Sequence, residues 1–379
     1  MSGPLAGTVV LELAGLGPAP FCGMVLADLG AEVIVVDRPG GVMAPVGDGD
    51  HDVLHRGKRS IAVDLKTEAG VEVVLRLVDT ADALVEGFRP GVVERLGLGP
   101  GVCLDRNPGL VYGRMTGWGQ SGPMSAMAGH DIDYIALSGV LHSIGPRDHP
   151  IPPLNLTGDF GGGGMLAAVG VLSALLHVRS GGPGQVVDAA MVDGSALLMA
   201  SHHGYLADGW WVEEREANLL DGGAPFYTTY ETADGHHMAV GALEPVFFEA
   251  LLAGLSLSSE DVGPQYDREQ WPRMRALFAE RFRSATRDEW AERFDGTDAC
   301  VAPVLSMAEA PEHPHNAARG TFVEIGGVRQ PAPAPRFSVT PAAIDRPPPG
   351  RGADSDAILD RSGFSPEEIG KLRESGAIA

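Results

Sequence analysis

The chain has 379 residues, 44% hydrophobic and 21% charged, the composition of a folded protein too long for one ordinary core. Its formal net charge of −22 argues against nucleic-acid binding, because such proteins usually carry a basic excess. We expect no membrane span, since no window approaches 18 uninterrupted apolar residues. Scattered cysteines without metal spacing, and an N-terminus without a secretory signal, predict a cytoplasmic protein; the cysteines are Cys22, Cys103 and Cys300.

The first half of the chain alternates between strand and helix patterns. Residues 8–13 predict a buried strand, residues 19–29 a helix and residues 32–37 a second strand, which together make a βαβ unit. This order predicts an α/β fold. The alternation continues with a helix at 67–78, a short strand within 79–86, a strand at 109–114, a helix at 165–177, a strand at 184–188 and a helix at 191–203.

The pattern changes near residue 225. Residues 226–232 alternate like an edge hairpin, and a capping box at Thr286–Glu289 begins one of the helices that follow. Residues 311–350 are rich in Pro and Ala and look extended, and the tail ends in a helix capped by Ser365. We therefore expect a large domain in two pieces, a small domain between them and two linkers. The pieces of the large domain are 1–190 and 336–379, the small domain is 225–315, and the linkers are 191–224 and 316–335.

Two glycine-flanked segments carry the residues best suited to catalysis. One is Gly129-His130-Asp131, and the other is Gly158-Asp159-Phe160 followed by glycines 161–164. Two proton acceptors in loop-like backbone can remove a proton from one face of a carbon and return it to the other. The alternatives are a structural His130 and an Asp159 that only N-caps a helix. The glycine run favours the catalytic interpretation, because consecutive glycines weaken a helix and close approach of the backbone to a ligand is the usual compensation. Backbone N–H groups at such a helix start could also stabilise an enolate oxygen.

Three further patterns have both a functional and a structural interpretation. Basic residues that suit phosphate groups gather at Arg38, in Arg56-Gly57-Lys58-Arg59 and at Arg89, or they form a solvated patch. The Gly-Ala-Leu-Glu segment ending at Glu244 offers a carboxylate that orients the histidine, or an acid in a first helical turn. Gly15-Leu16-Gly17 suggests a dinucleotide site, but Pro20 stands where the third glycine belongs.

These motifs resemble those of the family III CoA-transferases, and within that family those of the α-methylacyl-CoA racemases. The resemblance covers nearly the whole chain, from Pro4 to Asp356. The Leu-Gly-Ala-Glu segment from Leu29 and the Arg56–Ser60 segment belong to the whole family. The motifs around His130, Asp159 and Glu244 are those that distinguish racemases from transferases.

The resemblance implies an α/β fold with a Rossmann-like large domain built from both chain termini and a smaller α+β domain, in an interlocked homodimer. It also implies that His130 and Asp159 are the two bases, and that Glu244 supports His130 across the dimer. The expected CoA contacts are Arg38, Arg56, Lys58, Arg59, Arg89, Asp131 and Tyr134, with Tyr134 near the thioester.

The expected activity is interconversion of (R)- and (S)-2-methylacyl-CoA thioesters by two-base proton transfer through an enolate. It requires no metal and no cofactor besides the CoA of the substrate. One alternative is a CoA transferase in which Asp159 is the nucleophile that forms an acyl-enzyme anhydride. Others are a non-catalytic acyl-CoA-binding protein, and a nicotinamide dehydrogenase, which Pro20 disfavours.

Overall fold

The structure, a computed structural model, describes residues 3–41 and 51–379. The chain divides into two compact units. Unit 1 consists of Met1–Ser138, Pro153–Leu198 and Ala318–Ala379, and unit 2 of Gly139–Pro152 and Met199–Ala317. Unit 1 is thus assembled from separate stretches of the chain, and unit 2 takes in residues 139–152, which the sequence had assigned to the large domain.

The centre of unit 1 is a six-stranded parallel sheet with strand order β3-β2-β1-β4-β5-β6. Leu11 in β1 pairs with Ile34 on one side and with Leu84 on the other, so the direction of chain progression reverses at β1. This is the order of doubly wound nucleotide-binding sheets. The strands are β1 (Val9–Leu13), β2 (Glu32–Asp37), β3 (Arg59–Ala62), β4 (Ala83–Glu86), β5 (Val111–Thr116) and β6 (Gln185–Ala190).

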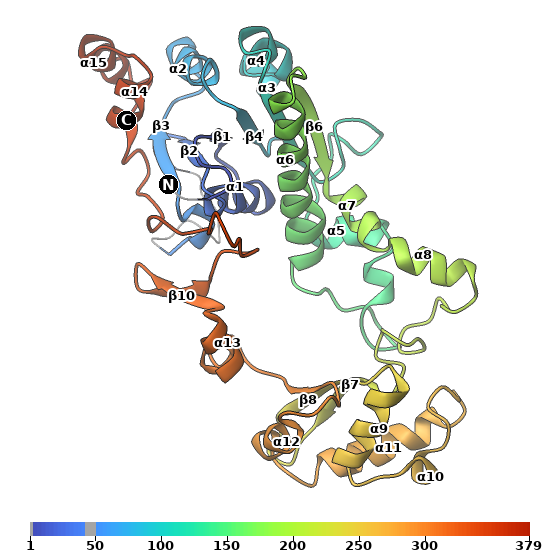
Figure 1. Ribbon diagram of the computed structural model, residues 1–379. Coiled ribbons are helices and arrows are strands. Elements are labelled where there is room, and N and C mark those ends of the chain that lie inside the picture. Colours follow the sequence, from blue (N-terminus) through green and yellow to red (C-terminus); the bar gives the residue numbers. More distant parts are fainter. Residues whose placement is uncertain (1–2, 42–50) are drawn as a thin grey trace. The chain divides into compact units, whose positions relative to one another are not determined.

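Helices cover both faces of this sheet and form two separate cores (Figure 1). Alternate residues of β1 point to opposite faces, so Leu11 and Leu13 enter one core while Val10 enters the other. The first core takes side chains from α2 (Glu68–Val78), α4 (Pro100–Arg106), α14 (Ser355–Arg361) and α15 (Pro366–Glu374). The second takes side chains from α1 (Pro18–Asp28) and α6 (Leu166–Arg179).

Short elements complete unit 1. They are the 3-10 helix η1 (Val53–His55), α3 (Val92–Arg95), α5 (Asp131–Leu137), the π-helix η3 (Leu156–Met165), α7 (Met191–Leu198) and the hairpin β10 (Phe322–Ile325) and β11 (Val328–Pro331). The hairpin lies in the region predicted to be extended. Its turn is Gly326-Gly327, both with positive φ of 60° and 77°, a turn signal that the sequence prediction overlooked.

Unit 2 has a three-stranded antiparallel sheet, in the order β7-β8-β9, packed against helices around an aromatic core. The predicted hairpin at 226–232 corresponds to β7 and β8. Thr286 caps α12 reciprocally with Glu289, which confirms the predicted capping box. The elements are η2 (Leu141–Ser143), α8 (Ala200–Ala207), β7 (Tyr227–Glu231), β8 (His237–Gly241), α9 (Pro245–Gly254), α10 (Ser259–Val262), α11 (Trp271–Phe282), α12 (Arg287–Phe294), β9 (Val301–Pro303) and η4 (Ala310–Glu312), with α13 (Pro314–Arg319) at the boundary.

Two helix predictions need correction. The helix expected at 191–203 is two helices, because the chain leaves α7 after Leu198 and resumes as α8, and the boundary between the units falls there. The segment around Asp159 is not a loop but the π-helix η3, which continues directly into α6.

The helix formed by η3 and α6 spans 24 residues, Leu156–Arg179, and is long and apolar enough to cross a membrane. Length and composition are its only membrane-like features, and core helices of soluble proteins share them. Ala167, Ala168 and Val171 belong to the second core of unit 1. The helix is therefore accounted for as a core element that carries Asp159 at its start.

Candidate active site

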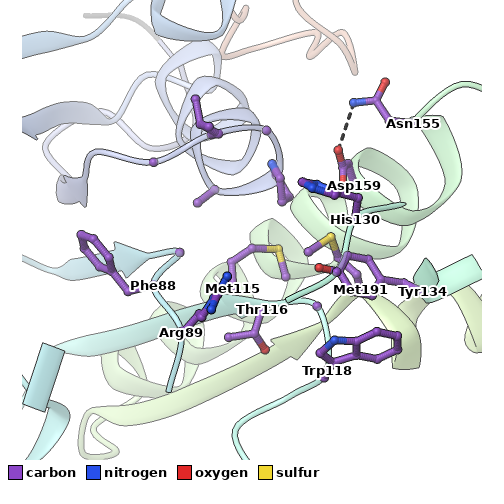
Figure 2. Close-up of a pocket in the computed structure, with 18 of the residues that line it drawn as sticks. Phe88, Arg89, Met115, Thr116, Trp118, His130, Tyr134, Asn155, Asp159 and Met191 are labelled. Atoms are coloured by element: carbon purple, nitrogen blue, oxygen red, sulfur yellow. Dashed lines mark hydrogen bonds between the residues drawn. The ribbon is translucent and has the colours of Figure 1, made fainter. Parts of the chain in front are cut away.

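A cavity of about 700 Å³ lies in unit 1, where the carboxyl ends of β1, β4 and β5 meet. Its walls come from the turn after β1, the segment after β4 and the segment after β5, together with residues before α5 and in η3. In an open α/β sheet this is the usual position of a ligand, beside the strand where the chain order reverses. Figure 2 shows the side chains that line it, among them Phe88, Arg89, Met115, Trp118, His130, Tyr134, Asn155, Asp159 and Met191.

His130 lies on the cavity wall at the N-cap of α5. Its backbone is extended, with φ −132° and ψ 173°, and its N–H donates to the Asp133 carboxylate at 2.9 Å. Asp133 therefore fixes the backbone of His130 by capping the helix and leaves the imidazole exposed. The imidazole is therefore accessible from the cavity, as a general acid or base must be.

Asp159 lies on the same cavity wall, in the first turn of η3. The Asn155 side-chain amide donates to the Asp159 carboxylate at 3.0 Å (Figure 2). The Asp159 backbone N–H donates to the Asp131 carboxylate at 2.7 Å. Burial raises the pKa of the Asp159 carboxyl, and the charge of Asp131 adds to this rise. The Asn155 hydrogen bond and the nearby His130 lower that pKa and partly offset the rise. The net effect favours a carboxyl that holds a proton at higher pH than an ordinary aspartate does.

The glycines after Asp159 serve packing between helices rather than close approach of a ligand. A Cβ on Gly164 would lie 2.6 Å from the Pro18 carbonyl oxygen of α1, and one on Gly162 would lie 2.6 Å from the Ser195 nitrogen of α7. Gly162, Gly163 and Gly164 are buried, and none of them lines the cavity. Their lack of side chains lets α1 and α7 hold η3 from two sides, which corrects the expectation that their backbone faces a ligand.

Tyr134 and Trp118 form another part of the cavity wall. Their rings pack edge to face with centroids 4.7 Å apart, and both line the cavity. Burial raises the pKa of Tyr134 to about 12, and the charge of Asp159 acts in the same direction. The phenol therefore stays protonated and can donate a hydrogen bond.

The predicted basic residues separate into two groups. Arg38 and Arg89 are exposed and, within residues 3–41 and 51–379, neither takes an ion-pair partner; Arg89 lines the cavity. Arg59 is half-buried and pairs with Glu32 at 3.0 Å and with Asp354 at 3.2 Å.

Arg56 and Lys58 are interior residues. Arg56 pairs with Asp28 at 2.6 Å, and Lys58, with 0% of its surface exposed, donates to Glu12 at 2.7 Å and to the Pro20 carbonyl at 2.9 Å. Neither cation faces the cavity in this structure, since both are used inside the protein. The overlooked signal was Glu12, an acid in the middle of an otherwise apolar strand, because a buried carboxylate requires a buried cation.

Two other predicted residues are not among those that line the cavity. Asp131 is buried, and its carboxylate accepts the backbone N–H of Asp159. Glu244 is in unit 2, exposed at the N-cap of α9, and its charge contributes to raising the pKa of Cys300. Asn155 was overlooked as a partner of Asp159, although its position four residues before the acid on one helix was a signal.

Comparisons with known proteins identify the family of this chain. The family model "CoA-transferase family III" matches residues 5–355. The chain is 50% identical to the α-methylacyl-CoA racemase of Mus musculus over 377 residues, which is 99% of this chain and 97% of that protein. It is 48% identical to the α-methylacyl-CoA racemase of Homo sapiens over 380 residues, again 99% and 97% of the two chains.

A solved structure supports the fold over nearly the same length. The crystal structure of a CAIB/BAIF family protein from Brucella suis has a TM-score of 0.80 with 28% identity, covering 96% of this chain and 100% of that chain. The match includes the mixed α/β architecture with its central parallel sheet. The protein belongs to the family III CoA-transferases.

Proposed function

We propose that the protein is an α-methylacyl-CoA racemase, an isomerase that interconverts (R)- and (S)-2-methylacyl-CoA thioesters. The observation that carries the proposal is that an imidazole and a carboxyl with a raised pKa, His130 and Asp159, line the same cavity from different elements. The racemase relatives, about half identical over the full chain, support the same activity.

The chemistry follows from the two side chains. His130 takes the α-proton from one epimer, a planar enolate forms, and protonated Asp159 returns a proton to the opposite face; the roles exchange in the reverse direction. The raised pKa of Asp159 suits this step, because a general acid must hold its proton near the working pH. No electrons are transferred, so the proposal requires only the thioester besides the protein.

For CoA we propose contacts with Arg38 and Arg89, whose guanidinium groups are exposed and available for phosphate. Tyr134 would lie beside the thioester, since it lines the same cavity as His130 and Asp159. Arg59 begins β3 and pairs with Glu32 at the amino end of β2, on the side of the sheet away from the carboxyl ends that form the cavity, so we do not include it among the CoA contacts. Arg56 and Lys58 are reassigned to the support of the fold.

We further propose an interlocked homodimer in which Glu244 of one subunit orients His130 of the other. Support comes from large apolar side chains that unit 1 leaves exposed on or next to α5, η3, α6 and α7, elements that contact one another, since exposed apolar surface of this kind often marks a protein interface. They include Leu137, Leu154, Leu156, Leu176 and Leu197, each more than half exposed.

The decisive experiment is incubation with (S)-2-methylacyl-CoA in deuterated water without an acceptor acid. Racemase activity predicts α-deuterium incorporation together with formation of both epimers, and replacement of His130 or Asp159 by Ala should abolish it. Absence of exchange with both short and long acyl chains would overturn the proposal. Hydroxylamine trapping of an acyl group on Asp159 would then indicate a transferase, and binding without either reaction would indicate an acyl-CoA-binding protein.

A further inference from the structure

The carboxylate of Asp131 has an unusual position. The residue is buried at the start of α5, directly after His130, and its Oδ2 accepts the backbone N–H of Asp159 at 2.7 Å across 28 residues of sequence. In the part of the chain that the structure describes, its other oxygen, Oδ1, is also buried and has no hydrogen-bond partner. A buried carboxylate oxygen without a hydrogen-bond partner lowers the stability of the fold, so this arrangement needs a physical explanation.

The helix that carries Asp159 supplies that reason. In a π-helix each N–H bonds to the carbonyl five residues earlier, so the N–H groups of the first turn have no acceptor within the helix. Asp159 lies in this turn of η3, after the N-cap Asn155, whose side chain makes no capping hydrogen bond. Asp131 therefore acts as a cap supplied from another helix, and its negative charge lies at the positive end of η3.

Gly158 makes this contact possible. A Cβ on Gly158 would lie 2.5 Å from Oδ2 of Asp131 and 3.2 Å from its Cα. Any side chain here would push the carboxylate away from the Asp159 amide. The glycine that precedes Asp159 thus has a specific steric purpose, unlike the glycines that follow, which pack against α1 and α7.

We propose that Asp131 is a positioning residue, a clasp that ties the backbone of one base to the residue adjoining the other and so sets the geometry between Asp159 and His130. This inference rests on the proposed racemase function for its catalytic consequence. It replaces the expected contact between the Asp131 carboxylate and CoA, since that carboxylate is buried against η3 and does not line the cavity.

The test uses Asp131→Asn, Asp131→Ala and Gly158→Ala in the full-length protein. Asparagine keeps an acceptor of the same shape but removes the charge, whereas alanine removes both. Thr67→Ala is the matched control, because Thr67 caps α2 through the Gly70 N–H at 3.0 Å, away from the cavity. In Asp131→Ala and Gly158→Ala we expect kcat to fall about tenfold or more, with KM changed far less.

The pH profile separates positioning from a general loss of stability. In the direction in which Asp159 is the base, the acid limb of kcat/KM for Asp131→Asn should move to lower pH, because a negative charge that helps to raise the pKa of Asp159 is gone. Thr67→Ala should leave the limb in place. An unchanged rate and profile in Asp131→Asn would overturn the proposal, and so would a raised KM with unchanged kcat, which would return Asp131 to CoA binding.

Hydrogen-exchange mass spectrometry of the peptide 155–165 tests the clasp without any substrate. Asp131→Ala should accelerate amide exchange in this peptide, and Thr67→Ala should not. If the wild-type protein fails to racemise, the proposed function is wrong. The exchange result by itself then shows whether Asp131 holds the backbone of η3 in place. Unchanged protection in both Asp131→Ala and Gly158→Ala would refute it.

Discussion

Replacement of Lys58 by methionine tests the assignment of the basic residues. Lys58 and Glu12 are both fully buried, 2.7 Å apart. Removal of the lysine leaves the Glu12 carboxylate with no cation, because burial lowers the pKa of the neighbouring His55, 4.0 Å away, to about 3 and keeps its imidazole neutral. Breaking a buried ion pair in this way costs about 3–5 kcal/mol of unfolding free energy. The double replacement Lys58→Met with Glu12→Gln removes both charges and should recover a large part of that loss.

The unfolding free energy of the Lys58→Met variant should also depend on pH in a predictable direction. Burial raises the pKa of the Glu12 carboxyl, while Lys58 lowers it, so loss of the lysine raises that pKa further. A carboxyl whose pKa is higher in the folded than in the unfolded state stabilises the fold below its unfolded pKa, and this contribution is lost as pH rises through the folded pKa. The difference in unfolding free energy between Lys58→Met and the wild type should therefore become smaller as the pH is lowered.

The assay is urea unfolding at one fixed protein concentration, with KM for the thioester measured in parallel. Arg89→Met is the matched control, because Arg89 is an exposed cation on the cavity wall. It should change the unfolding free energy by no more than about 0.5 kcal/mol while raising KM. Wild-type stability of Lys58→Met together with a raised KM would refute the structural assignment and restore Lys58 as a CoA ligand.

Three other predictions address the site and its assembly. Co-expression of His130→Ala and Glu244→Ala chains should restore about a quarter of wild-type activity, because about half of the dimers are mixed and each mixed dimer has one intact shared site of two. Activity no higher than that of the separate variants would exclude a site shared between subunits. Asn155→Ala should raise the apparent pKa of the acid limb of kcat/KM, because the amide that stabilises the Asp159 carboxylate is lost; a shift to lower pH would contradict this. Gly164→Ala should destabilise the protein by about 1–3 kcal/mol through the clash with Pro18, and unaltered thermal unfolding would show that α1 can move away.

The local sequence pattern was sufficient to predict the first βαβ unit and the capped helices. Residues 8–13 and 32–37 are apolar runs on the scale of buried parallel strands, and β1 and β2 form there. Ser365 and Glu368 cap α15 reciprocally, as their spacing predicted, because a capping box is complete within four residues. The motifs around His130 and Asp159 likewise pointed to two residues that line the cavity, while their role as bases stays a prediction.

Only the tertiary structure determined which partner each charged side chain has. Lys58 and Arg89 both belong to the predicted basic cluster, yet one is buried against Glu12, 46 residues away in sequence, and the other faces the cavity. Asp131 similarly meets the Asp159 amide only because α5 and η3 pack together. Since the cost of burying a charge depends on the partner that the fold brings to it, no local pattern could separate these roles.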